Sequence, residues 1–139
     1  RLFSGYTYLD PKFATFGPME MNSSSNQTEN ILKYRFKQSF KFDAETKYKG
    51  FAIGASVIYN SDMKAIDNVF NAFIKDVKNF RDEHNKGFTI VDIRTSYQIS
   101  NSLKASFIVG NIFNTEYSWR PGRLESMRNL TLRADYNFN

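Results

Sequence analysis

Residues 36–48 read FKQSFKFDAETKY and give the strongest indication of the fold. The even positions are mainly aromatic or small, with Phe36, Phe40, Phe42 and Tyr48 among them, whereas the odd positions carry Lys, Ser, Asp or Glu throughout. Side chains alternate across the pleat of a β-strand, so this period of two predicts a strand with one apolar and one charged face.

The same alternation returns in the sequence on both sides of this stretch. Lys49-Gly50 supplies a tight turn, and alternation then resumes over 51–59, which predicts a β-hairpin. A second hairpin is expected around Asn101-Ser102. The further strands are expected at 2–9, 89–99, 103–109 and 129–138.

Composition limits the chain to one domain and excludes several kinds of site. The chain has 139 residues and no cysteine, which removes disulfides, thiolate zinc sites and cysteine nucleophiles, and a single histidine, His84, argues against an imidazole-rich metal site. The mean hydropathy is −0.52, and no stretch approaches the ~18 apolar residues of a membrane-spanning helix. A spanning β-strand needs only about 9–11 alternating residues, so the low hydropathy does not exclude a membrane β-barrel.

The connections between the predicted strands alternate in length. Two turns are short, whereas about twenty residues follow the first strand, and 61–87 and 118–128 form two further long connections. Outer-membrane barrels show this asymmetry between short periplasmic turns and long extracellular loops. Within 61–87, apolar residues at spacings of three and four predict one short amphipathic helix, with Asp62 as its cap and Asn85 to Gly87 as its end.

These patterns predict an all-β fold: an antiparallel transmembrane β-barrel segment of about six strands, with a short helix in one extracellular loop. Six strands are fewer than the eight of the smallest single-chain bacterial barrels, and an open sheet would leave unpaired edges in hydrocarbon. Residues 1–139 are therefore expected to be part of one larger barrel domain.

The alternation also assigns the two faces of the sheet. Residues expected to face lipid are Phe40, Phe42, Ile53, Val57, Val91, Ile93, Phe107, Leu130 and Leu132. Residues expected to face the lumen or a plug are Lys41, Asp43, Asp92, Arg94 and Arg133. Rings near strand ends are expected to form the aromatic girdles of a membrane protein, and they are Phe36, Tyr48, Phe51, Tyr59, Tyr97, Phe113, Tyr117, Tyr136 and Phe138.

Part of the sequence resembles a known family. The stretch 110–117, GNIFNTEY, followed by Arg120-Pro121-Gly122-Arg123 and Arg128, is similar to the carboxy-terminal end of TonB-dependent outer-membrane receptors. The stretches 32–37 and 87–97 look like the same family, so the likeness covers about two thirds of the chain.

The resemblance implies the last six strands of a 22-stranded barrel whose amino-terminal plug and earlier strands lie outside this sequence. Such receptors use TonB, which contacts a box on the plug side, for active uptake of a scarce nutrient such as a ferric siderophore, a corrinoid or a glycan. Phe138, with Tyr136 two residues before it, matches the terminal aromatic signal that the barrel-assembly machinery recognises. The implied location is the outer membrane of a Gram-negative bacterium.

No catalytic or metal-binding constellation is evident, so neither an enzyme nor a cofactor is expected. The net charge of +5 is spread over all strands with acidic residues between, which argues against nucleic acid and favours lipopolysaccharide or an anionic ligand. Candidate ligand contacts in the last extracellular loop are Trp119, Arg120, Arg123 and Arg128. Trp119 also fits an alternative interpretation as a membrane-interface residue. The amphipathic helix in 61–87 could likewise serve as a docking surface for a surface lipoprotein.

Two other classes of protein fit the pattern. One is a complete eight-stranded outer-membrane barrel with a structural or adhesive role. The other is a soluble lipid-binding β-barrel that turns its apolar face inward.

Overall fold

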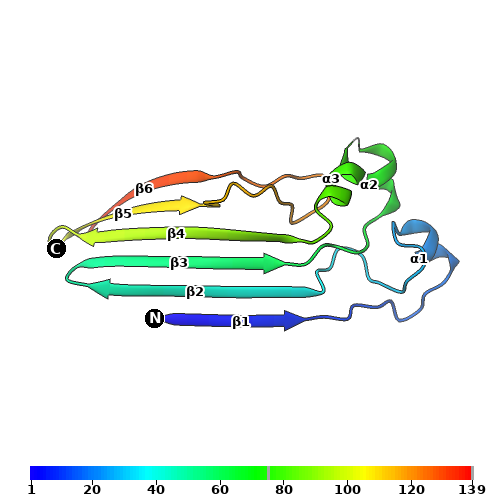
Figure 1. Ribbon diagram of the computed structural model, residues 1–139, viewed down its shortest axis with the longest axis horizontal. Coiled ribbons are helices and arrows are strands. Elements are labelled where there is room, and N and C mark those ends of the chain that lie inside the picture. The colour runs from blue at the N-terminus through cyan, green and yellow to red at the C-terminus, as the bar shows by residue number, and fades with distance from the viewer. Residues whose placement is uncertain (75, 139) are drawn as a thin grey trace.

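The computed structural model describes residues 1–74 and 76–138. In these residues six strands form one antiparallel sheet, in which each strand pairs with its neighbours in the sequence (Figure 1). The expected strand count and the two expected hairpins, β2–β3 and β4–β5, are thereby confirmed. The strands are β1 (Leu2–Tyr8), β2 (Gln38–Tyr48), β3 (Phe51–Asn60), β4 (Phe88–Gln98), β5 (Leu103–Gly110) and β6 (Asn129–Tyr136).

The two ends of the sheet differ as the sequence predicts. Both short turns lie at one end, near the two chain termini, and the long connections gather at the other end (Figure 1). The β2–β3 turn has positive φ at both central residues, +45° at Lys49 and +80° at Gly50. This is the geometry of a type I′ turn, whose twist matches that of the flanking strands.

The helical prediction needs correction, because three short helices occur in two of the loops within the part of the chain that the structure describes. They are α1 (Pro18–Ser23), α2 (Asn68–Phe73) and α3 (Val77–Glu83). The single helix expected in 61–87 is divided, since Asp76 has a left-handed φ of +69° that an α-helix cannot continue. Asp62 does not cap either helix: the residue before α2 is Asp67. The sequence prediction did not include α1, although Pro18 and Glu20 favour the start of a helix there. The Glu20 carboxylate accepts a hydrogen bond from the Gly17 N–H at 3.0 Å.

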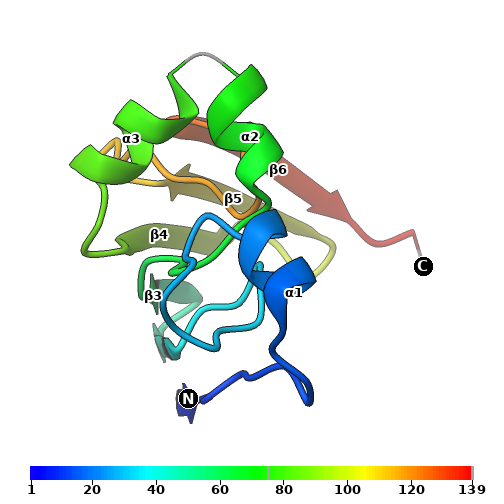
Figure 2. The same cartoon turned by 90° about the vertical axis from the view of Figure 1, so that its right-hand side faces the viewer.

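The pairing register places the side chains on two chemically distinct faces. Phe42, Val57, Val91 and their lateral neighbours share one face, here called the apolar face. Lys41, Asp43 and Arg94 belong to the opposite face, here called the polar face. Within the described residues neither face is covered by a second sheet, and the sheet curves as a single layer (Figure 2).

Aromatic rings form two rows on the apolar face. The turn-end row contains Tyr48, Phe51, Tyr97 and Tyr136, and the loop-end row contains Tyr6, Tyr8, Phe40 and Tyr59. Phe51 and Tyr59 are eight residues apart in the same strand, which is about 26 Å along the strand and about 20 Å along a barrel axis if the strand is tilted by ~40°.

The buried apolar core lies at the loop end of the sheet. Its buried side chains include Ile66, Val77 and Phe88. The loops 9–37, 61–87 and 111–128 pack together there, and we call their described residues the cap. The first two are joined by backbone hydrogen bonds, such as Tyr34 N–H to Ala65 C=O at 2.9 Å, and by the Asp67 carboxylate, which accepts from Lys33 Nζ and Tyr34 Oη.

Candidate functional site

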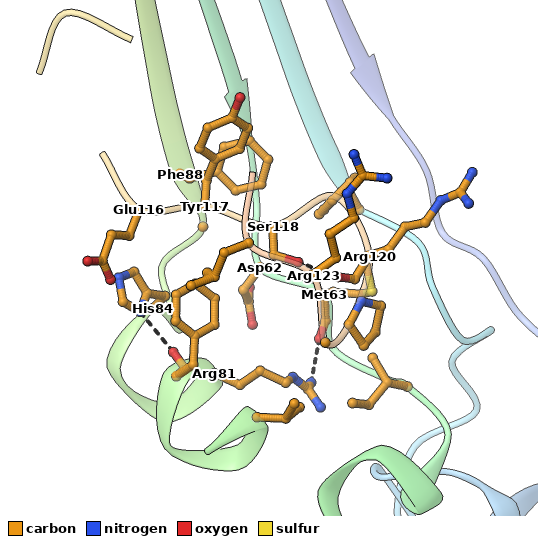
Figure 3. Close-up of a pocket in the computed structure, with 18 of the residues that line it drawn as sticks. Asp62, Met63, Arg81, His84, Phe88, Glu116, Tyr117, Ser118, Arg120 and Arg123 are labelled. Atoms are coloured by element: carbon orange, nitrogen blue, oxygen red, sulfur yellow. Dashed lines mark hydrogen bonds between the residues drawn. The ribbon is translucent and has the colours of Figure 1, made fainter. Parts of the chain in front are cut away.

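A cavity of about 350 Å³ lies in the cap. Its walls come from the loop after β3, from the α2–α3 segment, and from residues 116–124 of the last loop (Figure 3). The first two segments are neighbours in the sequence, whereas residues 116–124 lie far from them and are brought to the cavity by the packing of the cap. Five aromatic rings line the cavity, namely those of Phe36, Phe80, His84, Phe88 and Tyr117.

Arg81 of α3 is the most deeply placed charged group in the cavity wall. Its guanidinium donates to the Met63 carbonyl at 2.6 Å and to the Ser25 hydroxyl at 3.4 Å (Figure 3 shows the first bond). Burial lowers the pKa of Arg81, an effect that the more distant Asp62 and Asp82 oppose. No carboxylate of the described residues lies within 4.0 Å of this guanidinium. Sequence reasoning missed Arg81, because its helical spacing gives no sign of what surrounds it.

Arg120 and Arg123 reach the cavity from opposite ends of a tight turn. The Arg123 N–H donates to the Arg120 carbonyl at 3.3 Å, and Gly122 has a φ of +76°. Pro at the second position and Gly at the third are the residues that a type II turn requires. The turn packs on α2, since a Cβ on Gly122 would lie 3.2 Å from Ile74 Cδ1.

Two asparagines of the GNIFNTEY stretch hold the last loop in place. Asn111, buried with a φ of +50°, accepts from the Thr115 N–H at 2.9 Å and donates to the Thr115 carbonyl at 2.8 Å. Asn114, with a φ of +55°, accepts from the Arg128 N–H at 2.9 Å. Asn tolerates this left-handed conformation better than most residues. The motif that carries the family resemblance therefore fixes the loop by hydrogen bonds to its own backbone.

Trp119 belongs to an aromatic cluster with Phe36, Phe88 and Tyr117. The ring centroids of Phe88 and Trp119 are 5.2 Å apart and their planes meet at 87°. Phe88 pairs with Asn60 on the polar face, so the cluster covers the loop end of that face. The prediction of girdle positions for Phe36 and Tyr117 is wrong, because both rings pack against Phe88 instead. Trp119 retains 37% exposure.

The four candidate ligand contacts are only partly brought together. Arg120 and Arg123 line the cavity, whereas Trp119 packs beside three of its lining rings. Arg128 lies near the far end of the loop, next to β6, and is not part of the cavity wall.

The residues predicted for the lumen or a plug all share the polar face. Arg94 makes two parallel hydrogen bonds to the Asp43 carboxylate, at 2.8 and 2.9 Å, and its Nε lies 3.4 Å from Glu45. This ion pair crosses β3 above Gly54, where a Cβ would lie 2.8 Å from the guanidinium carbon. Asp92 accepts from the Asn111 N–H at 2.7 Å and so anchors the last loop. Lys41 and Arg133 occupy the same face.

The nine residues expected to face lipid share the apolar face. The two residues of the edge strand β6 are the most exposed of the nine, Leu130 at 67% and Leu132 at 83%. Tyr136 ends β6 on this face, and Phe138 follows it with its ring 4.8 Å from that of Tyr136. Within the described residues no helix has the length and apolar character needed to cross a membrane.

Comparison with known proteins supports the fold. No family model matches the sequence, and no curated protein matches it. Among solved structures, the chain is similar to the closed form of Fiu, the ferric-catecholate import receptor of E. coli K12, with a TM-score of 0.73 and 17% identity. The match covers 99% of this chain and 19% of that receptor. The chain is thus all-β and has the fold of a barrel segment of a TonB-dependent receptor.

Proposed function

We propose that this chain supplies strands to the barrel of an outer-membrane transporter that imports a scarce nutrient with energy delivered through TonB. The observation that carries the proposal is the apolar face, which two aromatic rows bound at a spacing of about 20 Å. Outer-membrane barrels carry an outward apolar band ~25 Å tall between two girdles of aromatic residues. The fold likeness to an import receptor agrees with this arrangement.

The two faces have separate roles in this proposal. The apolar face contacts lipid, and the polar face, with its Arg94–Asp43 pair, faces a hydrated lumen or a plug. The open edges of β1 and β6 pair with further strands of the same receptor, because unpaired edges in hydrocarbon would leave backbone groups unsatisfied. The partners are thus outer-membrane lipid, including lipopolysaccharide, the rest of the receptor, TonB, and the barrel-assembly machinery through Tyr136 and Phe138. Nucleic acid has no part in the proposal, and it assigns no catalytic chemistry to the chain.

For the cargo, we infer a ferric siderophore of the catecholate type. Fiu is a ferric-catecholate import receptor, and the cap of this chain presents Arg120 and Arg123 beside the aromatic cluster of Trp119. Cationic side chains attract an anionic chelate, and rings pack against its aromatic arms. These arginines favour an anionic chelate over a corrinoid or a glycan as the cargo.

A growth assay tests the proposal. The full-length protein is expressed in a Gram-negative strain that lacks its own catecholate receptors, and iron is supplied only as a ferric catecholate. Growth should depend on both the protein and TonB, and changing Arg120 and Arg123 together to Gln should slow uptake, whereas Lys49→Gln in the distant turn should not. Uptake that persists without TonB would contradict the transporter assignment. Recovery of the protein without detergent from the soluble fraction would instead favour a lipid-binding barrel.

A small structural or adhesive barrel makes a different prediction. The purified protein would then fold into lipid vesicles with no additional strands, and the strain would not gain iron uptake. Cross-linking of β1 and β6 to each other would support that alternative, since a closed small barrel must join strands that the larger barrel keeps apart.

A further inference from the structure

We propose that the cavity in the cap is a binding site for a small monocyclic aromatic anion, with Arg81 as its counter-charge. A volume of about 350 Å³ lies near the lower limit of ligand pockets, which span ~300–1,000 Å³. It suits a ligand of one ring and is small for a metal chelate with several aromatic arms. The inference therefore goes beyond the proposed transport function and holds whatever cargo the barrel carries.

The walls of the cavity favour a flat ring. Phe88 approaches it from β4 and Tyr117 from the last loop (Figure 3). Phe80 of α3 also lines it. The His84 ring stacks on Phe80 at a centroid distance of 4.1 Å. Because aromatic rings pack in offset or edge-to-face arrangements, these surfaces can hold a planar guest more specifically than an aliphatic one.

Arg81 supplies the reason for an anion. A guanidinium has five N–H donors, and the two bonds to Ser25 and Met63 leave three of them free of a partner in the described residues. Both of its acceptors are neutral, so its charge is not balanced by a carboxylate in contact with it. A carboxylate guest would pair with the planar fork of the guanidinium through charge-assisted hydrogen bonds.

The other charged groups of the cavity do not cancel this charge. Asp62 is paired with Lys64 at 3.0 Å, and Asp76 and Glu116 are exposed side chains. Arg120 has no carboxylate within 4.0 Å in the described residues, and Arg123 has only a surface pair with Glu125 at 3.6 Å. The exposed charges of the wall are two of each sign, Asp76 and Glu116 against Arg120 and Arg123. Of the two half-buried charges, Asp62 has a cationic partner and Arg81 has no carboxylate of the described residues in contact, so the charge left unpaired against the apolar walls is that of Arg81.

Calorimetric titration of the purified full-length protein in detergent tests this site, with benzoate as the probe and benzyl alcohol as its uncharged match. Benzoate should bind about 10- to 100-fold more tightly than benzyl alcohol, the ratio expected when a charge-assisted hydrogen bond is gained. Arg81→Met, which keeps the aliphatic stem, should remove this preference. Lys78→Gln, which removes a charge from the exposed side of the same helix, should leave it unchanged.

A second variant addresses the cavity without touching Arg81. Val77 lines the cavity and is 8% exposed, so Val77→Phe should fill part of the space and abolish benzoate binding. Absence of benzoate binding to the unmodified protein, equal binding of the two probes, or unchanged binding by folded Arg81→Met would each overturn the proposal. Failure of iron uptake together with normal benzoate binding would count against the transporter assignment alone.

Discussion

The assignment of the apolar face can be tested by placing a charge at its centre. Ile93 is the suitable position, because it pairs with Ala55 on one side and Val109 on the other. It lies four residues from Tyr97 of the turn-end row and four from Thr89, which pairs with Tyr59 of the loop-end row. Each interval is about 13 Å along the strand, or about 10 Å of depth at a tilt of ~40°.

At that depth an Arg on the lipid face costs about 2–4 kcal/mol, falling to about 0–1 kcal/mol near the interfaces. Ile93→Arg should therefore lower the free energy of unfolding by about 2–4 kcal/mol, and Thr89→Arg, on the same face at the loop end, by about 1 kcal/mol at most. Ser56→Arg should change it by less than about 1 kcal/mol, since Ser56 lies on the polar face one residue from Ala55, the partner of Ile93. Urea titration of folding into phospholipid vesicles measures all three.

Two outcomes would refute the assignment of faces. One is an equal loss for Ile93→Arg and Ser56→Arg, which would mean that both faces meet the same medium. The other is a larger loss for Thr89→Arg than for Ile93→Arg, which would remove the dependence on depth. Either result would also remove the observation on which the transporter proposal depends.

Three further predictions concern the polar face and the cap. Gly54→Ala should cost about 1–3 kcal/mol, because the new Cβ displaces the Arg94 guanidinium, and the cost should disappear in an Arg94→Ala background when unfolding is measured in a double-mutant cycle. Asn111→Gly keeps the left-handed backbone accessible but removes the side-chain hydrogen bonds, so amide exchange in the last loop should speed up while exchange in the sheet stays unchanged. Hydrogen bonds from Lys33 and its neighbouring tyrosine lower the pKa of Asp67, so they stabilise the cap above the ordinary carboxyl pKa, and this stabilisation is lost as the pH falls through the lowered value. Acid should therefore speed proteolysis of the cap in the unmodified protein. In Asp67→Asn the rate of proteolysis should not depend on this titration.

The family-like motif shows how far sequence reasoning extends into the site. The residues of GNIFNTEY and Arg-Pro-Gly-Arg could be recognised as a pattern, and the type II turn follows from local rules, since Pro fixes φ and Gly alone adopts the positive φ easily. The roles of Asn111 and Asn114 could not be predicted, because their side chains bond to backbone groups whose positions depend on the folded loop. Arg81 gave no signal for the same reason: its partners, Ser25 and Met63, come from two other segments.

The sequence by itself determined the strands, the two tight turns and the membership of each face, because alternation along a strand and turn chemistry are local and the register carries them across the sheet. Tertiary structure decided the division of the predicted loop helix into α2 and α3, the move of Phe36 and Tyr117 from the expected girdle into an aromatic cluster, and the cavity beside Arg81. Those features depend on which loops meet in space, and the free energy of packing loops that are distant in sequence leaves no periodic trace in the order of the residues.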